Sequence, residues 1–189
     1  MSRVSTKKLG FWLTMAALIA VQLFFRTQAH ADVPMRGAWK EVYSRTGDCK
    51  ISFPDLPQMF QQSFKVDESG KKLTYDIYLA PYMDRGVCML LIAQYPMPLP
   101  GGHEVVGLEG LVKGIVGQHP DNQLIFAELI DLQGFPALTF LVQSGKNYFR
   151  GQAFMVGNKL YMVAMEGGKQ NFEEPTFQRF LKSFQLIIP

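Results

Sequence analysis

Two cysteines and two of the three histidines are the residues of this chain that could together bind a metal ion. Cys49 and Cys88 with His103 and His119 would supply the ligands of a Cys2His2 zinc site. Neither the cysteine pair nor the histidine pair has the short separation that common structural zinc sites use. His103 follows two glycines and His119 precedes Pro120, so both are expected at exposed helix ends. The sequence therefore predicts no metal site and no cofactor.

A hydrolytic Ser-His-Asp arrangement could be assembled from Ser144, His119 and Asp121, because such triads need not be close in sequence. The chain has no Gly-x-Ser-x-Gly, His-Glu-x-x-His or Ser-x-x-Lys motif, and no Walker loop or Gly-x-Gly-x-x-Gly. We therefore expect a protein that is not an enzyme and has no catalytic residues. A hydrolase that uses this triad stays open as an alternative.

The first 31 residues have the pattern of an export signal. Basic residues within positions 3–8 precede residues 9–25, which are almost uninterrupted in apolar side chains. Alanines at the third and first positions before Asp32 give the small-x-small pattern that signal peptidase recognises. The pattern predicts a cleavable signal peptide over residues 1–31 and export to the periplasm or the medium.

An uncleaved membrane anchor is the competing interpretation of the same segment. The apolar stretch is 17 residues long and contains Thr14 and Gln22. A bilayer-spanning helix needs about 20 predominantly apolar residues. We therefore expect one domain over residues 32–189 that keeps no stable membrane anchor after cleavage.

Charge argues against nucleic acid as a partner. The chain has 19 Lys and Arg against 16 Asp and Glu, and four of those basic residues but no acidic one lie in residues 1–31. The remainder carries 15 basic and 16 acidic side chains without a Lys/Arg cluster. Proteins that bind phosphate backbones need such a cluster. Hydrophobic residues make up 48% of the chain and charged residues 19%, which is typical of a folded globular domain.

Export would also change the chemistry of the two cysteines, because thiols in an oxidising compartment tend to pair. A Cys49–Cys88 disulfide would close a loop of about 40 residues and stabilise the fold by about 4 kcal/mol in the chain-entropy model. The alternative is two buried free thiols on neighbouring strands. Neither cysteine lies in a Cys-x-x-Cys motif, so a redox-active pair is not expected.

Most of the chain has the patterns of β-strands. Alternating apolar and polar residues predict strands over 49–53, 61–66 and 73–79, and the last two form a hairpin. Residues 87–93 and 160–165 are apolar at every position, which predicts strands covered on both faces. From residue 124 onward, turn residues separate a meander of four strands.

Two segments have helical spacing instead. Leu108, Leu111, Val112 and Ile115 form one stripe of a helix over 104–118, and a second amphipathic helix ends the chain. Pro175 suits the first turn of this second helix, with Asn171 as a rival start. Together the elements predict an α+β domain in which an antiparallel sheet has helices on both faces.

The first predicted helix contains glycine at every third or fourth residue, at Gly107, Gly110, Gly114 and Gly117. These glycines cluster roughly opposite the apolar stripe. They reduce the intrinsic stability of the helix by about 3–4 kcal/mol relative to alanine. One hypothesis is that the glycine face lets a partner's backbone approach closely. The alternative is a locally weak, solvent-facing helix.

The strand predicted over 147–156 has one face that mixes aromatic and polar residues, namely Tyr148, Arg150, Gln152 and Phe154. Such a face could line a shallow groove for a ligand or a peptide. A helix that lies over this face would explain the same pattern.

In its order of turns and core positions, the chain resembles the PsbP-like family from about residue 39 to residue 188. The motifs that carry the resemblance are Ile51-Ser52-Phe53-Pro54 with Pro57, Leu132-Gln133-Gly134-Phe135-Pro136-Ala137, Val156-Gly157-Asn158-Lys159-Leu160-Tyr161 and Phe180-Leu181-Lys182-Ser183-Phe184. The family's fold is shared by the extrinsic protein of photosystem II, a Ran-binding protein and exported bacterial proteins of unknown function. The resemblance implies an α/β/α sandwich and no catalytic residue to carry over.

The resemblance also implies a module for binding or assembly. We therefore expect an exported protein that works by binding another protein of the cell envelope. The alternative is a periplasmic carrier of a small molecule or lipid, with its pocket between helix and sheet.

Overall fold

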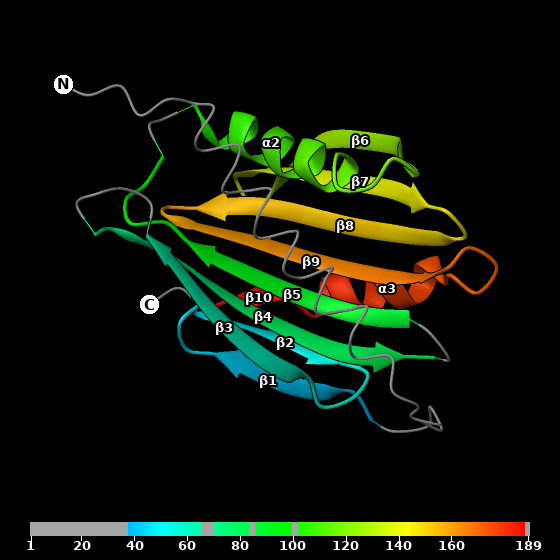
Figure 1. The fold of residues 1–189 in the computed structure, drawn as a ribbon. Coiled ribbons are helices and arrows are strands. Elements are labelled where there is room, and N and C mark those ends of the chain that lie inside the picture. Colours follow the sequence, from blue (N-terminus) through cyan, green and yellow to red (C-terminus); the bar gives the residue numbers. More distant parts are fainter. Residues whose placement is uncertain (1–37, 66–69, 84–85, 100–101, 188–189) are drawn as a thin grey trace.

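The chain folds into two antiparallel sheets and two helices in the part that the computed structural model describes, residues 38–65, 70–83, 86–99 and 102–187 (Figure 1). The predicted signal peptide, residues 1–31, lies outside these ranges. The large sheet has the order β3 (Gln58–Lys65), β4 (Lys72–Tyr82), β5 (Gly86–Gln94), β9 (Lys159–Gly168), β8 (Asn147–Val156), β7 (Phe135–Ser144) and β6 (Asn122–Leu132). The small sheet has the order β1 (Lys40–Ser44), β2 (Cys49–Phe53) and β10 (Gln185–Leu186).

Alternation along the strands divides the core of the large sheet into two layers. On β4, Leu73, Tyr75 and Ile77 belong to the cluster that contains the apolar stripe of helix α2 (Glu104–Val116). The intervening Tyr78 and Ala80 belong to the other cluster, which contains residues of helix α3 (Glu174–Lys182). Because successive side chains point to opposite faces of a strand, the two helices serve different layers of the core.

The central strands β5 and β9 are buried on both faces, as their continuous apolar sequences predict. Side chains from Cys88 to Ala93 and from Leu160 to Met165 are all at most 6% exposed. The two strands pair with each other directly, and each has a further strand on its other side. Both faces of this pair are therefore buried, and the prediction from sequence is confirmed.

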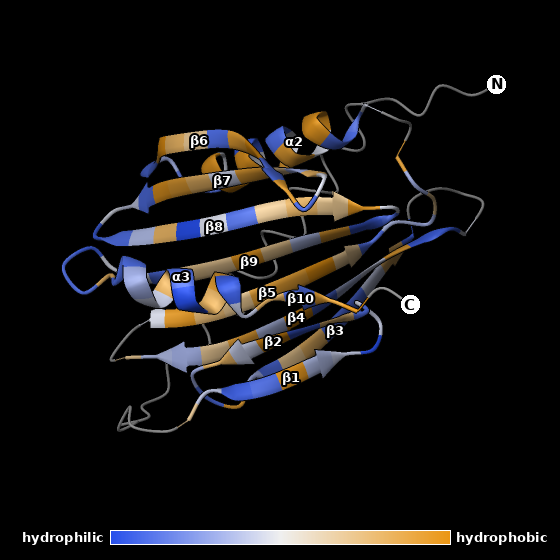
Figure 2. Ribbon diagram, turned by 180° about the vertical axis from the view of Figure 1, so that it is seen from behind, coloured by the Kyte–Doolittle hydropathy of each residue, from blue (hydrophilic) through white to orange (hydrophobic). Residues whose placement is uncertain are grey.

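The described residues form an α+β domain, but one of its layers differs from the predicted sandwich. The layer that contains α3 is shared with the small sheet, which lies beside α3 over the large sheet (Figure 2). Ile51 and Phe53 of β2 join Phe177 and Phe180 of α3 in one apolar cluster. A second sheet therefore covers much of the surface that the simple α/β/α arrangement assigns to a helix.

Both helices begin near the positions predicted from sequence. Helix α2 begins at Glu104 and ends at Val116, where Gly117 caps it, and α3 has Pro175 in its first turn with Glu173 before it. Within the described ranges, no helix has the length and apolar character that crossing a membrane requires.

Candidate functional site

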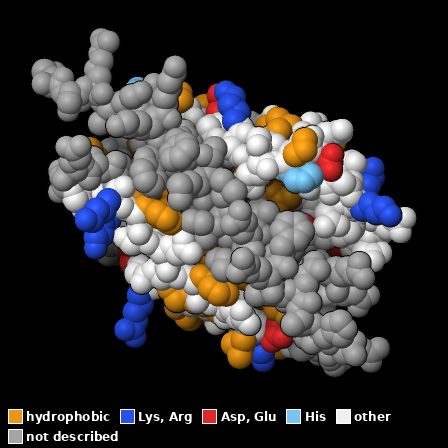
Figure 3. All heavy atoms as spheres, viewed as in Figure 1, with side chains coloured by type: hydrophobic (Ala, Val, Ile, Leu, Met, Phe, Trp, Pro, Cys, Tyr) orange, Lys and Arg blue, Asp and Glu red, His pale blue; other side chains and the backbone are white. Residues whose placement is uncertain are grey.

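The last strand of the large sheet, β6, is an unpaired edge with an apolar surface. In the part of the chain that the structure describes, ten of its 11 residues pair with β7 and none pairs with a strand on the other side. Four large apolar side chains are between 38% and 52% exposed on it, namely Leu124, Ile125, Phe126 and Leu129. In the space-filling view, apolar side chains are visible at the end of the molecule where Figure 1 places β6 (Figure 3).

The opposite edge of the same sheet, β3, has a different composition. Pro57 precedes it, Gln61 and Gln62 lie at its centre and Lys65 ends it. Proline and lysine on an edge strand hinder the addition of a further strand. The sequence of β6, NQLIFAELIDL, contains neither residue and no arginine. Of the two edges, β6 is therefore the one open to a partner strand.

The β6–β7 hairpin is fixed by a tight turn at one end and is irregular at the other. Gln133 and Gly134 both have positive φ, which is the conformation of a type I′ turn, and the Gly134 amide donates to Asp131 Oδ1 at 2.9 Å. The pairing register shifts between Leu124 and Phe126 and is regular from Phe126 onward. The regular part is a well-defined strand.

The side chain of Arg150 packs against β6 on the face of the large sheet that α3 covers. Its Nη1 donates to Thr139 Oγ1 at 2.7 Å and to the Phe140 carbonyl oxygen at 2.9 Å, and its side chain is 10% exposed. The guanidinium lies 4.8 Å from the ring centroid of Phe126 and 4.9 Å from that of Phe177. Burial lowers the pKa of Arg150. This cation therefore links the edge strand to helix α3.

Helix α3 also explains the mixed aromatic and polar face predicted for β8. Glu174 in its first turn lies 3.6 Å from Arg150 Nε, and Phe177 packs on the same guanidinium. Gln152 and Phe154 are buried as well, at 4% and 1% exposed. The face is covered, which supports the alternative of a helix above it, and it is not an open groove.

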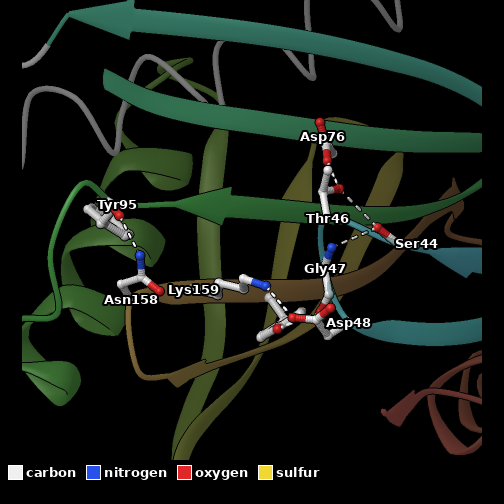
Figure 4. A network of polar contacts seen from close by, with 9 residues as sticks. Ser44, Thr46, Gly47, Asp48, Asp76, Tyr95, Asn158 and Lys159 are labelled. Carbon is white, nitrogen blue, oxygen red and sulfur yellow. Dashed lines mark hydrogen bonds and ion pairs between the residues drawn. The ribbon is translucent and has the colours of Figure 1, made fainter. Parts of the chain in front are cut away.

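A second polar site joins the two sheets at the turn between β1 and β2 (Figure 4). Asp76 of β4 is 4% exposed and accepts hydrogen bonds from Thr46 Oγ1 and from Gln61 Nε2. The Gly47 amide donates to Ser44 Oγ at 3.1 Å. A Cβ on Gly47 would lie 2.4 Å from Ile92 Cδ1, so a residue without a side chain lets the turn approach the large sheet this closely.

The turn between β8 and β9 holds the same junction from the other side (Figure 4). Lys159 Nζ lies 2.7 Å from Asp48 Oδ2, and the Tyr161 hydroxyl donates to the Gly47 carbonyl oxygen at 2.7 Å. Asn158 Nδ2 donates to the Tyr95 carbonyl oxygen at 2.7 Å. These partners come from a motif that the sequence indicates only as a turn, so its role in joining the sheets is visible only in the fold.

The structure contains no disulfide between Cys49 and Cys88, and both cysteines are free thiols in it. Cys49 lies on β2 of the small sheet and Cys88 on β5 of the large one, and both are fully buried. Each packs in the apolar layer between the sheets, where burial raises the pKa of Cys49 to about 12 and also raises that of Cys88. This matches the predicted alternative of two buried thiols, except that the two strands belong to different sheets.

Of the other sequence candidates, the structure brings His119 and Asp121 together at the surface, with His119 Nδ1 3.6 Å from Asp121 Oδ2. His103 and His119 are exposed, as predicted, and His119 Nδ1 accepts a hydrogen bond from the Asp121 amide at 3.2 Å. Ser144 lies on β7, where it pairs with Asn122 of β6. Within the described ranges, no three His, Cys, Asp or Glu residues are grouped as a metal site would require.

The four helix glycines do not share one exposed face. Gly107 and Gly114 are buried, Gly110 is half-buried and Gly117 is exposed. A Cβ on Gly107 would lie 3.3 Å from Leu99 Cδ1. The buried face of α2 contains Gly107 and Gly114 together with apolar residues such as Leu111. Two of the four glycines of the predicted partner surface therefore lie inside the fold.

Comparison with known proteins identifies the fold. No protein-family model matches the chain. No curated protein matches it. Among solved structures, cyanobacterial PsbP from Synechocystis sp. PCC 6803 is similar with a TM-score of 0.53 and 13% identity, over 85% of this chain and 99% of that one. A Pseudomonas aeruginosa protein of unknown function has a TM-score of 0.45 and 12% identity, over 81% and 98% of the two chains. The architecture and the first of these similarities show that the chain has a PsbP-like fold.

Proposed function

We propose that this chain is an exported, non-enzymatic binding module that pairs the edge of β6 with a strand of a protein partner in the cell envelope. The observation that carries the proposal is the apolar edge itself, on which Leu124, Ile125 and Leu129 are about half exposed. Edge strands that lack proline and lysine are templates for strand addition. In such complexes the backbone groups supply hydrogen bonds, and alternate side chains supply specificity.

The edge offers apolar contacts on both of its faces. Leu129 pairs with Leu138 and therefore lies on the layer of α2. Phe126 contacts Arg150 and lies on the layer of α3. A strand added beside β6 would continue both layers of the core, and this continuity supports a protein partner.

The proposal that the protein is not an enzyme rests on the state of its nucleophiles. Cys49 and Cys88 are buried, and burial raises the pKa of both thiols, so the reactive thiolate is disfavoured. His119 is exposed and bonded within its own turn.

Export and the envelope location rest on residues 1–31 of the sequence. Their basic start, apolar stretch and small residues before Asp32 are those of a signal peptide. The mass of the protein purified from an envelope fraction tests this part directly. A chain that begins at Asp32 supports it, and a chain that retains residue 1 contradicts it.

The carrier alternative requires room between α2 and the large sheet. Leu108, Leu111, Val112 and Ile115 are each at most 4% exposed and pack on that sheet in one cluster. Their side chains occupy the layer in which a ligand would have to lie. The structure therefore favours the protein partner over the carried ligand.

A photo-crosslinking amino acid at residue 129 tests the binding edge in living cells. We expect one dominant crosslinked species from this position. The matched control is residue 59 on β3, since Met59 is 50% exposed and Leu129 is 52% exposed. Absence of any crosslinked species from residue 129, or the same species from both positions, would refute the proposed edge.

A further inference from the structure

We propose that the strand added to β6 is β6 of a second copy of this chain, antiparallel and related by a two-fold axis at Leu129. This inference rests on the proposed function, because it names the occupant of the same edge. It predicts a homodimer in which the two large sheets become one continuous sheet.

The regular part of β6 fixes which residues are available. Residues 126–132 pair with β7 without interruption, from Phe126 opposite Leu141 to Leu132 opposite Phe135. The register shift lies before them, between Leu124 and Phe126, and the turn residue Gln133 lies after them. A seven-residue segment of undistorted strand is thus available, and Leu129 is its centre.

Two-fold symmetry allows few registers for this segment. Antiparallel strands that form one sheet about a two-fold axis must place residues of the same face opposite each other. The axis therefore passes at a residue, which is then opposite its own copy. An axis at Leu129 is the arrangement that pairs all seven regular residues. An axis at Ala127 would extend the pairing into the register shift, and an axis at Ile130 would extend it into the turn.

The charges on β6 are compatible with this register and disfavour an axis at a charged residue. Glu128 and Asp131 are the charged residues of the strand. An axis at Glu128 would place two carboxylates directly opposite each other, which is unfavourable. With the axis at Leu129, Glu128 is opposite Ile130 of the second copy and meets its own copy only diagonally. Asp131 is then opposite Ala127 of the second copy.

The same register brings apolar side chains together. Leu129 is opposite its own copy, and Phe126 is opposite Leu132 of the second copy. Leu129 and Phe126 are 52% and 38% exposed in the single chain. The pairing buries the same apolar surface on both copies, as every two-fold symmetric interface does. A second copy therefore pairs with the backbone of β6 and covers its apolar side chains. No strand of complementary charge from another protein is required.

The first test measures the mass of the purified full chain over a range of concentrations, by native mass spectrometry and light scattering. We expect a dimer with a dissociation constant on the order of micromolar, since one strand pair makes a small interface. The variant Leu129→Lys places two cations opposite each other, and we expect it to weaken the dimer at least about tenfold. Leu129→Val should retain the dimer, because valine suits a strand.

Met59→Lys on the β3 edge is the matched control and should leave the dimer intact. Circular dichroism and urea unfolding show whether each variant is folded. A wild-type chain that stays monomeric at all concentrations would overturn the proposal. Equal weakening by Met59→Lys and Leu129→Lys would overturn it as well.

Disulfide trapping tests the register. Under oxidising conditions, Leu129→Cys should form a covalent dimer, because residue 129 is opposite its own copy. Leu132→Cys alone should not form one, whereas the double variant Phe126→Cys, Leu132→Cys should. The native thiols are buried, which keeps them out of the reaction. Failure of Leu129→Cys to crosslink in a chain that dimerises would overturn this register.

Failure of this inference is distinguishable from failure of the proposed function. A photo-crosslinked species at residue 129 with twice the mass of one chain supports both. A species of any other mass, together with a monomeric purified chain, keeps the binding edge and overturns the second copy. No crosslinked species overturns both.

Discussion

Replacing Arg150 by methionine should destabilise the fold, because it removes a buried cation and keeps the apolar stem. The guanidinium donates to Thr139 Oγ1 and to the Phe140 carbonyl oxygen, and both acceptors lie in the core. Hydrogen bonds from a charged group contribute about 1.5–3 kcal/mol each to stability. The cost of burying the cation, which lowers the pKa of Arg150, offsets part of this contribution.

The partner carboxylate decides the size of the remaining loss. Glu174 is 50% exposed, so it stays hydrated when Arg150 is removed and is not left as a buried unpaired charge. The loss should therefore fall below the roughly 3–5 kcal/mol of breaking a fully buried pair. Methionine also keeps sulfur–aromatic contacts of about 0.3–1.5 kcal/mol each with Phe126 and Phe177. We expect a net loss of about 2 kcal/mol, which lowers the melting temperature by about 4–8 °C.

Urea unfolding followed by circular dichroism measures this loss. Arg179→Met is the control, because Arg179 makes a similar ring contact, 4.4 Å from Trp39, but is exposed. It should change the free energy of unfolding by less than about 1 kcal/mol. An Arg150→Met variant as stable as the wild type would refute the reasoning. So would an Arg179→Met variant that loses as much.

Three further predictions concern packing, thiols and pH. Gly151→Ala should lower stability by about 1–3 kcal/mol in thermal unfolding, since its Cβ would lie 2.4 Å from Phe140 Cζ, and Phe140→Leu in the same chain should recover part of the loss. Cys49 and Cys88 should resist a thiol reagent at pH 8 until the chain unfolds, because burial raises the pKa of both; rapid labelling of the folded chain would contradict this. Burial also raises the pKa of Glu166 above its usual 4.5. The folded chain therefore binds the proton of this carboxyl more tightly than the unfolded chain, and stability falls as the pH rises above 4.5 through the raised pKa. Glu166→Gln should therefore gain stability over the wild type at pH 8 but not at pH 4, and a constant difference would contradict this.

The sequence predicts the elements whose patterns are local. The strand over 49–53 has the predicted bounds and ends before Pro54, and α2 begins at the predicted Glu104. Strands β1 and β10 are not predicted. Only two residues make up β10, and β1 has a single aliphatic residue, Val42. Neither segment therefore shows the alternation of apolar and polar residues that predicts a strand. They become strands because β2 pairs with both.

The proposed binding edge could not be identified from sequence, because edge position is a property of the sheet order. The residues of β6 are as apolar as those of a covered strand, and a strand in the same meander, β9, is completely enclosed. The choice between a disulfide and two buried thiols could not be made from sequence for a related reason. Export and loop length indicate whether two cysteines could pair, but the fold places Cys49 and Cys88 in different sheets as core residues.

The two edge strands of the large sheet are held by different contacts. At the β3 end, Asp76 on the neighbouring strand accepts hydrogen bonds from Gln61 of β3 and from Thr46 in the turn between β1 and β2, so polar contacts tie this end to the rest of the chain. At the β6 end, Arg150 supports the strand from one layer, and its outer edge has no pairing strand in the described chain. If a partner strand pairs with β6 as proposed, the contacts of Arg150 would hold β6 extended beforehand and so reduce the entropy lost on binding. Arg150 lies on the inner strand β8. Replacing it should nevertheless weaken the proposed pairing of β6 with a partner strand.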